Sequence, residues 1–199
     1  DVYKRQPLFV SHFRPSNNGS GHTPVILETS VSVLWSPICD RFDIDSPIFG
    51  FAHDVEVVAA ITNAGGFGVY GATRRFPEEI TQELAQIRSL VGNRPFGVDL
   101  VLPPGMPEHN SREAIEAEIP AKHREFVAQL IDRFAVPRAS KPGMRTRFIR
   151  SKEIEQAQLQ AIMDSDVEML ACGIGAPPDV VAEAKDRGKS TLALIGSPH

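Results

Sequence analysis

The chain has 199 residues and a formal net charge of −4, with 42% hydrophobic and 23% charged residues. This length and composition are sufficient for a globular domain with a substantial core. The mild acidity argues against a nucleic-acid partner, because nucleic-acid binding is typical of clustered basic surfaces. No apolar run approaches the ~20 residues of a membrane span, so no membrane association is expected.

The cysteines indicate the compartment, and the histidines bear on metal binding. Cys39 and Cys172 are the only cysteines, and they form no Cys-x-x-Cys motif. This pattern favours a reducing environment over a disulfide scaffold. No signal peptide is evident, so we expect a cytoplasmic protein. The histidines and carboxylates lack metal-ligand spacing, and no metal is expected.

The first 33 residues differ in character from the rest. Asp1–Gln6 resembles the in-frame translation of a sequencing adapter, and residues 7–33 mix Pro, Asn, Gly, Ser and Thr without a sustained period. We interpret residues 1–33 as a sequencing scar with a disordered lead-in, and residues 34–199 as the folded region. Because the chain ends directly after an apolar strand, we expect an N-terminal fragment of a larger domain, inactive alone.

The first predicted unit is a strand, a helix and a second strand. The strand covers Pro47–Phe51, and Asp54 is suited to be the N-cap of the helix that follows. Gly65 ends this helix as a C′ glycine would. A second apolar strand follows at Phe67–Tyr70. The segment therefore predicts a βαβ unit, in which ligands bind at the loop after the first strand.

The next helix begins at Pro77 and ends at Gly92. A strand follows at Phe96–Leu102, with Asp99 as its single polar residue. The apolar stripe of the helix consists of Ile80, Leu84, Ile87 and Val91.

A long connection separates this strand from the next one. It contains a predicted helix at Ala121–Phe134, a loop rich in Pro, Arg and Lys at Pro137–Arg150, and a further helix at Ser151–Met163. The apolar face of the first helix carries Phe126, Val127, Leu130, Ile131 and Phe134.

The last predicted unit is again strand, helix and strand. These elements cover Val167–Cys172, Pro178–Arg187, which Gly188 ends, and Thr191–Ile195. Five apolar strands alternating with helices predict an α/β fold with a parallel sheet. Two architectures stay open from this pattern: an open doubly wound sheet, and a partial (β/α)8 barrel with about five βα units. A complete barrel typically needs ~250 residues.

Four motifs in order resemble one family. They are the lead-in and strand at Leu34–Ile48, the turn at Asn63–Gly68, the strand at Arg94–Leu100, and the Gly-x-Gly-x-Pro segment at Gly173–Pro177. Together they resemble the nitronate monooxygenases, once called 2-nitropropane dioxygenases. The resemblance covers roughly residues 34–196 and favours the TIM barrel.

The resemblance implies an FMN-dependent barrel that oxidises alkyl nitronates with O2 to a carbonyl compound and nitrite. The small-molecule partners would be a nitronate or related anion and O2, while the oligomeric state is left open. The FMN-dependent enoyl-ACP reductases share the fold and the cofactor and remain an alternative. A flavodoxin-like binding or regulatory module is the alternative of another class.

The resemblance also points to residues that would bind the cofactor. Gly50 and Phe51 stand where family members place backbone against the flavin ring. Asp99 replaces an Asn that usually bonds the flavin, and as an acceptor it could bind N–H groups. Gly173 opens the Gly-x-Gly-x-Pro segment. Gly65 is better explained as a helix stop than as part of a phosphate-binding loop.

The catalytic residue stays unknown at this stage. In the family, the base is a His in a Gly-Gly-His segment, and this sequence contains no such segment. His53 follows the first strand and could line the mouth, although the interpretation as a surface or helix-entry residue is preferred. A basic cluster is interpreted as a solvated loop or as a lid over an anionic substrate; it comprises Arg138, Lys141, Arg145, Arg147 and Arg150.

Overall fold

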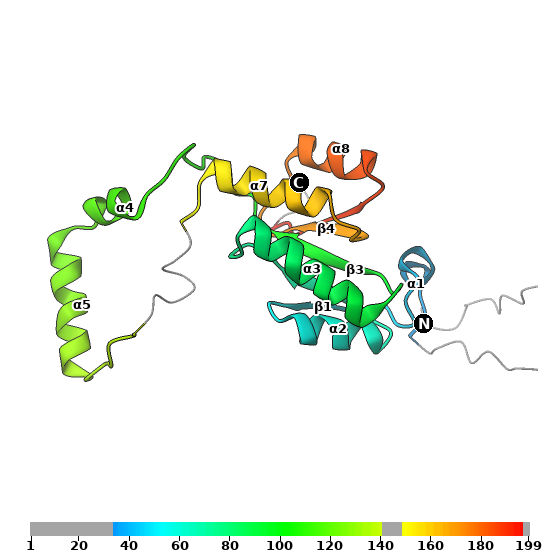
Figure 1. Ribbon diagram of the computed structural model, residues 1–199, viewed down its shortest axis with the longest axis horizontal. Helices are drawn as coiled ribbons and strands as arrows, with labels where there is room; N and C mark the ends of the chain where they lie inside the picture. The colour runs from blue at the N-terminus through cyan, green and yellow to red at the C-terminus, as the bar shows by residue number, and fades with distance from the viewer. Residues whose placement is uncertain (1–33, 141–148, 197–199) are drawn as a thin grey trace, which may run out of the picture. The chain divides into compact units, whose positions relative to one another are not determined.

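The computed structural model describes residues 34–140 and 149–196. In these residues, five parallel strands form one sheet in the order β1-β2-β3-β4-β5 (Figure 1). The strands are β1 Phe49–Ala52, β2 Phe67–Gly71, β3 Phe96–Leu100, β4 Met169–Cys172 and β5 Ser190–Ala193. All five strands were predicted from the sequence, with ends that differ by a few residues. The lead-in predicted for residues 1–33 lies outside the described residues.

Helices alternate with these strands. Those that precede or connect the strands are α1 Pro37–Phe42, α2 Val55–Asn63, α3 Pro77–Val91, α4 Arg112–Glu118, α5 Ala121–Arg133, α7 Lys152–Met163 and α8 Pro178–Asp186. The sequence predicted all of them except α1 and α4. Both are short, and neither has room for a repeating apolar period. No helix in the described ranges is long and apolar enough to cross a lipid bilayer.

The local start and stop signals act as the sequence predicts. The Asp54 carboxylate accepts a hydrogen bond of 3.0 Å from the backbone N–H of Val57, which caps α2. Gly65 follows the end of α2 with φ 87°, and Gly92 follows α3 with φ 63°. Both glycines therefore have a positive φ, which other residues rarely tolerate.

The strand order decides between the two architectures. Each strand pairs with its neighbours in the sequence, so the sheet grows in one direction only. A doubly wound sheet such as the flavodoxin type reverses direction at a switch point. The flavodoxin-like alternative is therefore excluded, and the order is that of consecutive βα units in a (β/α)8 barrel.

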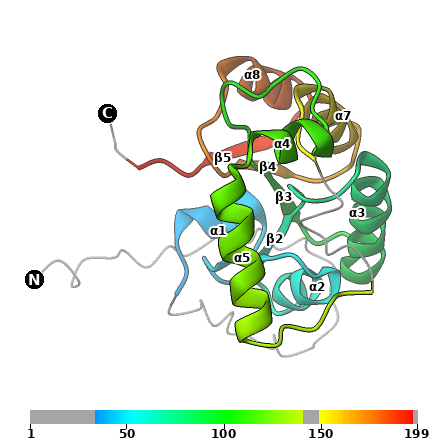
Figure 2. The same cartoon turned by 90° about the vertical axis from the view of Figure 1, so that its left-hand side faces the viewer.

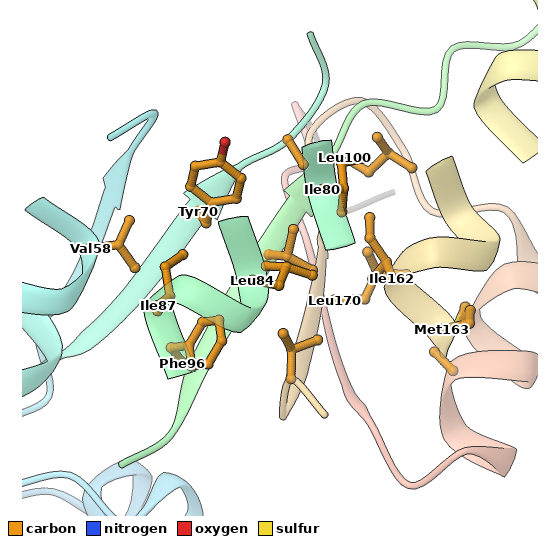
Figure 3. Packing of buried hydrophobic residues seen from close by; sticks show 14 of the residues in the cluster. Val58, Tyr70, Ile80, Leu84, Ile87, Phe96, Leu100, Ile162, Met163 and Leu170 are labelled. Carbon is orange, nitrogen blue, oxygen red and sulfur yellow. The ribbon is translucent and has the colours of Figure 1, made fainter. Parts of the chain in front are cut away.

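Two apolar clusters lie on opposite faces of the sheet. On the helix face, the side chains of Tyr70, Phe96, Leu100 and Leu170 belong to the cluster that α2, α3, α7 and α8 cover (Figures 2 and 3). On the other face, which we call the inner face, Phe67 and other strand side chains pack with Cys39 of α1. Because side chains alternate along a strand, Asp99 lies on the inner face.

The apolar face of α5 differs from the expectation that periodicity alone suggests. A stripe of this kind normally packs against a core. In the described structure, no residue of α5 is buried, and Phe126 and Phe134 are 59% and 66% exposed. The periodicity thus predicts the helix correctly but carries no information about what covers it.

Candidate functional site

The candidate site lies at the carboxyl ends of neighbouring strands. In the sheet register, Gly71 of β2 pairs with Asp99 of β3, and Asp99 pairs with Ala171 of β4. His53 directly follows β1, and its ring reaches the backbone of Gly71. Gly173 directly follows β4. We call these residues, His53, Gly71, Asp99 and Gly173, the row. Ligands of α/β barrels bind at this end of the strands, so the row lies where a site is expected.

Asp99 is the most unusual residue of this row. It is only 7% exposed, although carboxylates are rarely buried without partners. Among the residues that the structure describes, none donates a hydrogen bond to its carboxylate. Burial raises the pKa of this carboxyl, and the charge of nearby His53 partly opposes the rise. The residue is buried while its carboxylate oxygens keep some contact with solvent, so they are accessible to a ligand that brings N–H groups.

Gly173 leaves space beside Asp99. A Cβ atom at this position would lie 3.3 Å and 3.5 Å from the two Asp99 carboxylate oxygens and 2.8 Å from Cγ2 of Val101. The absence of a side chain at residue 173 therefore keeps the approach to the carboxylate open. Its proposed contact with a cofactor stays a prediction, and the geometry is compatible with it.

Gly50 and Phe51 lie within β1, inside the strand range that the sequence predicts. They point in opposite directions. A Cβ atom at Gly50 would lie 2.6 Å from Cδ1 of Ile61, so this glycine allows α2 to pack closely on the helix face. Phe51 lies on the other side of the strand and is 56% exposed. Packing alone thus explains Gly50, while Phe51 is the one that borders the site.

His53 contacts this row through Gly71 and Phe51, which the sequence analysis did not predict. Its Nδ1 atom lies 2.9 Å from the carbonyl oxygen of Gly71, and its ring meets Phe51 edge-on, with the ring centroids 5.0 Å apart. The side chain is exposed, which agrees with the interpretation as a surface residue, and a role at the mouth stays a prediction. The available signal was the position of His53 between the end of a strand and the N-cap Asp54, together with the glycine that ends the next strand.

A polar cluster lies beside the row and consists of Tyr70 in β2, Arg75 in the loop after β2 and Glu83 in α3. Arg75 Nε donates hydrogen bonds of 2.9 Å to the Tyr70 hydroxyl and to the Glu83 carboxylate, and the Tyr70 hydroxyl also donates to Glu83. Burial and the contact with Glu83 raise the pKa of Tyr70. Arg75 also donates to the backbone oxygen of His53 at 3.3 Å. The cluster therefore fixes the loop that carries His53.

A pocket of about 590 Å³ adjoins the row. It is lined mainly by the loops at residues 102–106 and 174–177, which follow β3 and β4, and by Lys152 and Glu155 of α7. Asp99 itself does not line it. The pocket is therefore a neighbouring hollow at the same end of the sheet, with one cation and one carboxylate at its wall.

Arg150 belongs to the predicted basic cluster and lies close to this pocket. Its guanidinium donates to the carbonyl oxygen of Val101 and lies 3.5 Å from the Glu155 carboxylate. These contacts tie α7 to the end of β3, so Arg150 is engaged rather than free for an anion. Lys141, Arg145 and Arg147 lie outside the described residues. A lid made by the whole cluster therefore stays a prediction.

The comparisons with known proteins identify the family. A family model described as Nitronate monooxygenase matches residues 32–198. The chain belongs to the nitronate monooxygenase family. A curated relative, named "Putative monooxygenase Rv1533" in Mycobacterium tuberculosis, is 32% identical over 173 residues. That match covers 80% of this chain and 45% of the relative, so the chain spans less than half of the relative's length.

Two solved structures have a fold similar to that of this chain. Nitroalkane oxidase from Streptomyces ansochromogenes is 24% identical, with a TM-score of 0.54 over 82% of this chain and 43% of the other. FabK from Thermotoga maritima is 17% identical, with a TM-score of 0.52 over 80% and 37%. At these identities the likeness concerns the fold alone. Together with the strand order, it confirms the predicted partial (β/α)8 barrel.

Proposed function

We propose that residues 34–199 form the N-terminal part of a flavin-binding barrel domain whose whole protein is an FMN-dependent oxidoreductase. The proposed reaction converts alkyl nitronates and O2 to a carbonyl compound and nitrite. Membership in the nitronate monooxygenase family supports the reaction class. The observation that carries the proposal in this chain is the buried Asp99 carboxylate, which faces the mouth of the barrel without a hydrogen-bond donor among the described residues.

The residues present fit the proposed cofactor. FMN carries N–H groups that can donate hydrogen bonds. The Asp99 carboxylate is an acceptor that has no donor among the described residues. Gly173 keeps the approach to this carboxylate free of a side chain, and Phe51 offers an exposed aromatic face at the same end of the sheet. When bound, FMN supplies the electron-transfer chemistry, while the chain contributes binding, orientation and electrostatics. Gly50 would contribute through its backbone only, because its open side faces α2.

FMN binding by this chain tests the proposal directly. Quenching of flavin fluorescence measures the affinity of the wild-type chain and of Asp99→Ala, which removes the acceptor. Loss of one charge-assisted hydrogen bond corresponds to about a tenfold weaker affinity. Asp132→Ala removes a carboxylate from the exposed α5 and is the matched control. Equal affinities of the Asp99→Ala and Asp132→Ala variants, or no binding by the wild type, would contradict the assignment.

The reaction is tested separately in the whole protein with FMN added, because the proposed activity is that of the whole protein. Oxygen uptake and nitrite release with an alkyl nitronate support the proposed monooxygenase. NADH oxidation with an enoyl thioester would instead support the alternative FMN-dependent enoyl-ACP reductase. The cytoplasmic location and the absence of nucleic-acid and metal partners stay predictions from the sequence.

A further inference from the structure

Helices α4 and α5 form one unit, which we call the α4–α5 hairpin (residues 112–134). Arg124 Nη2 donates hydrogen bonds of 2.9 Å and 2.8 Å to the carbonyl oxygens of Glu116 and Ile119, at the end of α4. Carbonyl groups in the last turn of a helix have few donors within the helix itself. A side chain of α5 thus closes the end of α4, so the two helices present one joint surface to a partner.

The hairpin exposes an apolar surface. Six of its side chains are each at least 39% exposed: Ile115, Ile119, Phe126, Val127, Ile131 and Phe134. Aliphatic and aromatic side chains present on the order of 100–200 Å² each, so about 400–500 Å² of apolar surface is open. A standard protein interface buries ~800 Å² on each partner, somewhat more than half of it apolar. The open apolar surface therefore has the area that one half of a stable dimer interface needs.

The two helices carry opposite charges beside these apolar side chains. The charged residues of α4 are Arg112, Glu113, Glu116 and Glu118, which leaves this helix net acidic. In α5, Lys122 and Arg133 border the apolar stripe at the helical period of about 100° per residue, whereas Glu125 and Asp132 lie on the opposite side. Within the described part of the chain, Glu118, Lys122 and Arg133 have no ion-pair partner. The hairpin thus offers an acidic helix and a basic apolar face whose charges are not paired with each other.

The combination of area and charge favours one kind of partner. An anionic lipid surface or a nucleic acid carries charge of one sign only, so it would attract the basic border of α5 and repel α4. A second copy related by a two-fold axis presents its α5 to α4 and its α4 to α5. Each acidic helix then faces a basic one, and both apolar surfaces are covered at once.

We propose that this chain self-associates through the α4–α5 hairpin, with α4 of each copy packed on α5 of the other. Phe126 and Phe134 are the apolar anchors at the centre of this interface, because large aromatic side chains carry most of the energy of an interface. Glu118 of one copy and Lys122 of the other belong to its charged rim, which sets the orientation of the two copies. No residue of the candidate site takes part, so the association is independent of the proposed reaction.

The first test measures the association and its apolar centre. Sedimentation velocity of the whole protein over a range of concentrations should show a dimer with a dissociation constant in or below the micromolar range. The double variant Phe126→Asn with Phe134→Asn should weaken the dimer by at least about 30-fold, because it removes both aromatic anchors. Leu90→Asn is the matched control, since Leu90 is a 46% exposed leucine of α3, and it should leave the dimer unchanged.

Other occupants of the apolar surface give different results in this test. A whole protein that stays monomeric well above micromolar concentration, or a dimer that the double variant leaves intact, would overturn the proposal. Thermal unfolding of the same variants distinguishes the reasons. A lower Tm in the double variant without a change in mass would mean that another part of the same protein covers α5. An unchanged Tm in a monomer would mean that the surface is open or binds a different partner.

The second test measures whether α4 faces α5 of the other copy. One variant reverses the charges of α4 by Glu116→Lys with Glu118→Lys, and a second reverses those of α5 by Lys122→Glu with Arg133→Glu. Each variant alone places like charges on facing helices and should dimerise about tenfold more weakly than the wild type.

Mixing the two charge-reversed variants should restore the dimer, because every α4 then faces an α5 of opposite charge. Energy transfer between the two variants, each labelled with a different fluorophore, measures this heterodimer. A mixture that associates no better than the separate variants would overturn the arrangement. A loss confined to the α5 variant would also overturn it, because it would indicate that α5 packs on α5.

Discussion

Arg88 of α3 allows a prediction whose size follows from the structure. Its guanidinium donates five hydrogen bonds, to the carbonyl oxygens of Gly92, Arg94 and Asp166 and to the carboxylates of Asp166 and Glu168. It also lies 4.7 Å from the centre of the Phe96 ring. These partners lie at the amino ends of β3 and β4, away from the candidate site. Changes at Arg88 should therefore alter stability without altering the ligand-binding end.

The expected loss for Arg88→Ala is about 2–3 kcal/mol. The Asp166 and Glu168 side chains are 64% and 37% exposed, so the two ion pairs are screened by water and contribute little. The bonds to backbone oxygens and the contact with the Phe96 ring supply most of the effect, at roughly 0.5–1 kcal/mol each. Arg88→Lys should cost about half as much, because an ammonium cannot reproduce the planar fork.

Urea unfolding followed by circular dichroism measures this loss of free energy, and thermal unfolding measures the fall in Tm. A domain of this size should lose about 2–4 °C of Tm per kcal/mol, so Arg88→Ala should melt roughly 4–12 °C lower. The matched control is Arg112→Ala in α4, which removes an exposed i,i+4 pair with Glu116 and should cost at most ~0.5 kcal/mol. A loss below ~1 kcal/mol in Arg88→Ala, or equal losses in both variants, would refute the reasoning.

Three further changes test the site and the helix ends. Burial raises the Asp99 pKa, so the ionised form destabilises the fold once pH rises above the carboxyl's unfolded value. Asp99→Asn should therefore stabilise the chain by about 1 kcal/mol at pH 7 and lose this advantage at acid pH; equal stability of both forms at all pH values would contradict this. Asp54→Ala removes the cap on the Val57 N–H and should cost about 1 kcal/mol in thermal unfolding, whereas Asp54→Asn should cost much less. Gly92→Ala meets no atom within 4 Å, so a cost of about 1 kcal/mol would come from φ 63° alone; an unchanged Tm would exclude backbone strain there.

The elements of the fold are predictable where local chemistry is decisive. Asp54, Gly65 and Gly92 fix the ends of α2 and α3 through capping and positive φ, which depend on a few neighbouring residues. The stripe of α3 is buried as its period predicts. The stripe of α5 has the same kind of period, yet none of its side chains is buried. Periodicity reports what a helix can bury, while burial depends on distant parts of the chain.

The candidate site is predictable only in part for a related reason. Asp99 is visible in the sequence because a single carboxylate interrupts an apolar strand. His53 and Gly71 carry no such signal, since their significance depends on the register that brings three strands together. Gly50 shows the opposite error: a glycine beside the expected ligand position faces Ile61 and serves helix packing. Which face a residue occupies follows from strand alternation once the strand ends are known.

The sequence by itself determined the succession of βα units, the ends of their helices and the family to which the chain belongs. These properties depend on residue order, local hydrogen bonding and the sequences of the motifs. Only the tertiary structure decided the one-way strand order, the inner-face position of Asp99 and the contact of His53 with Gly71. These features arise between segments separated along the chain, and no local energy term specifies which strands become neighbours.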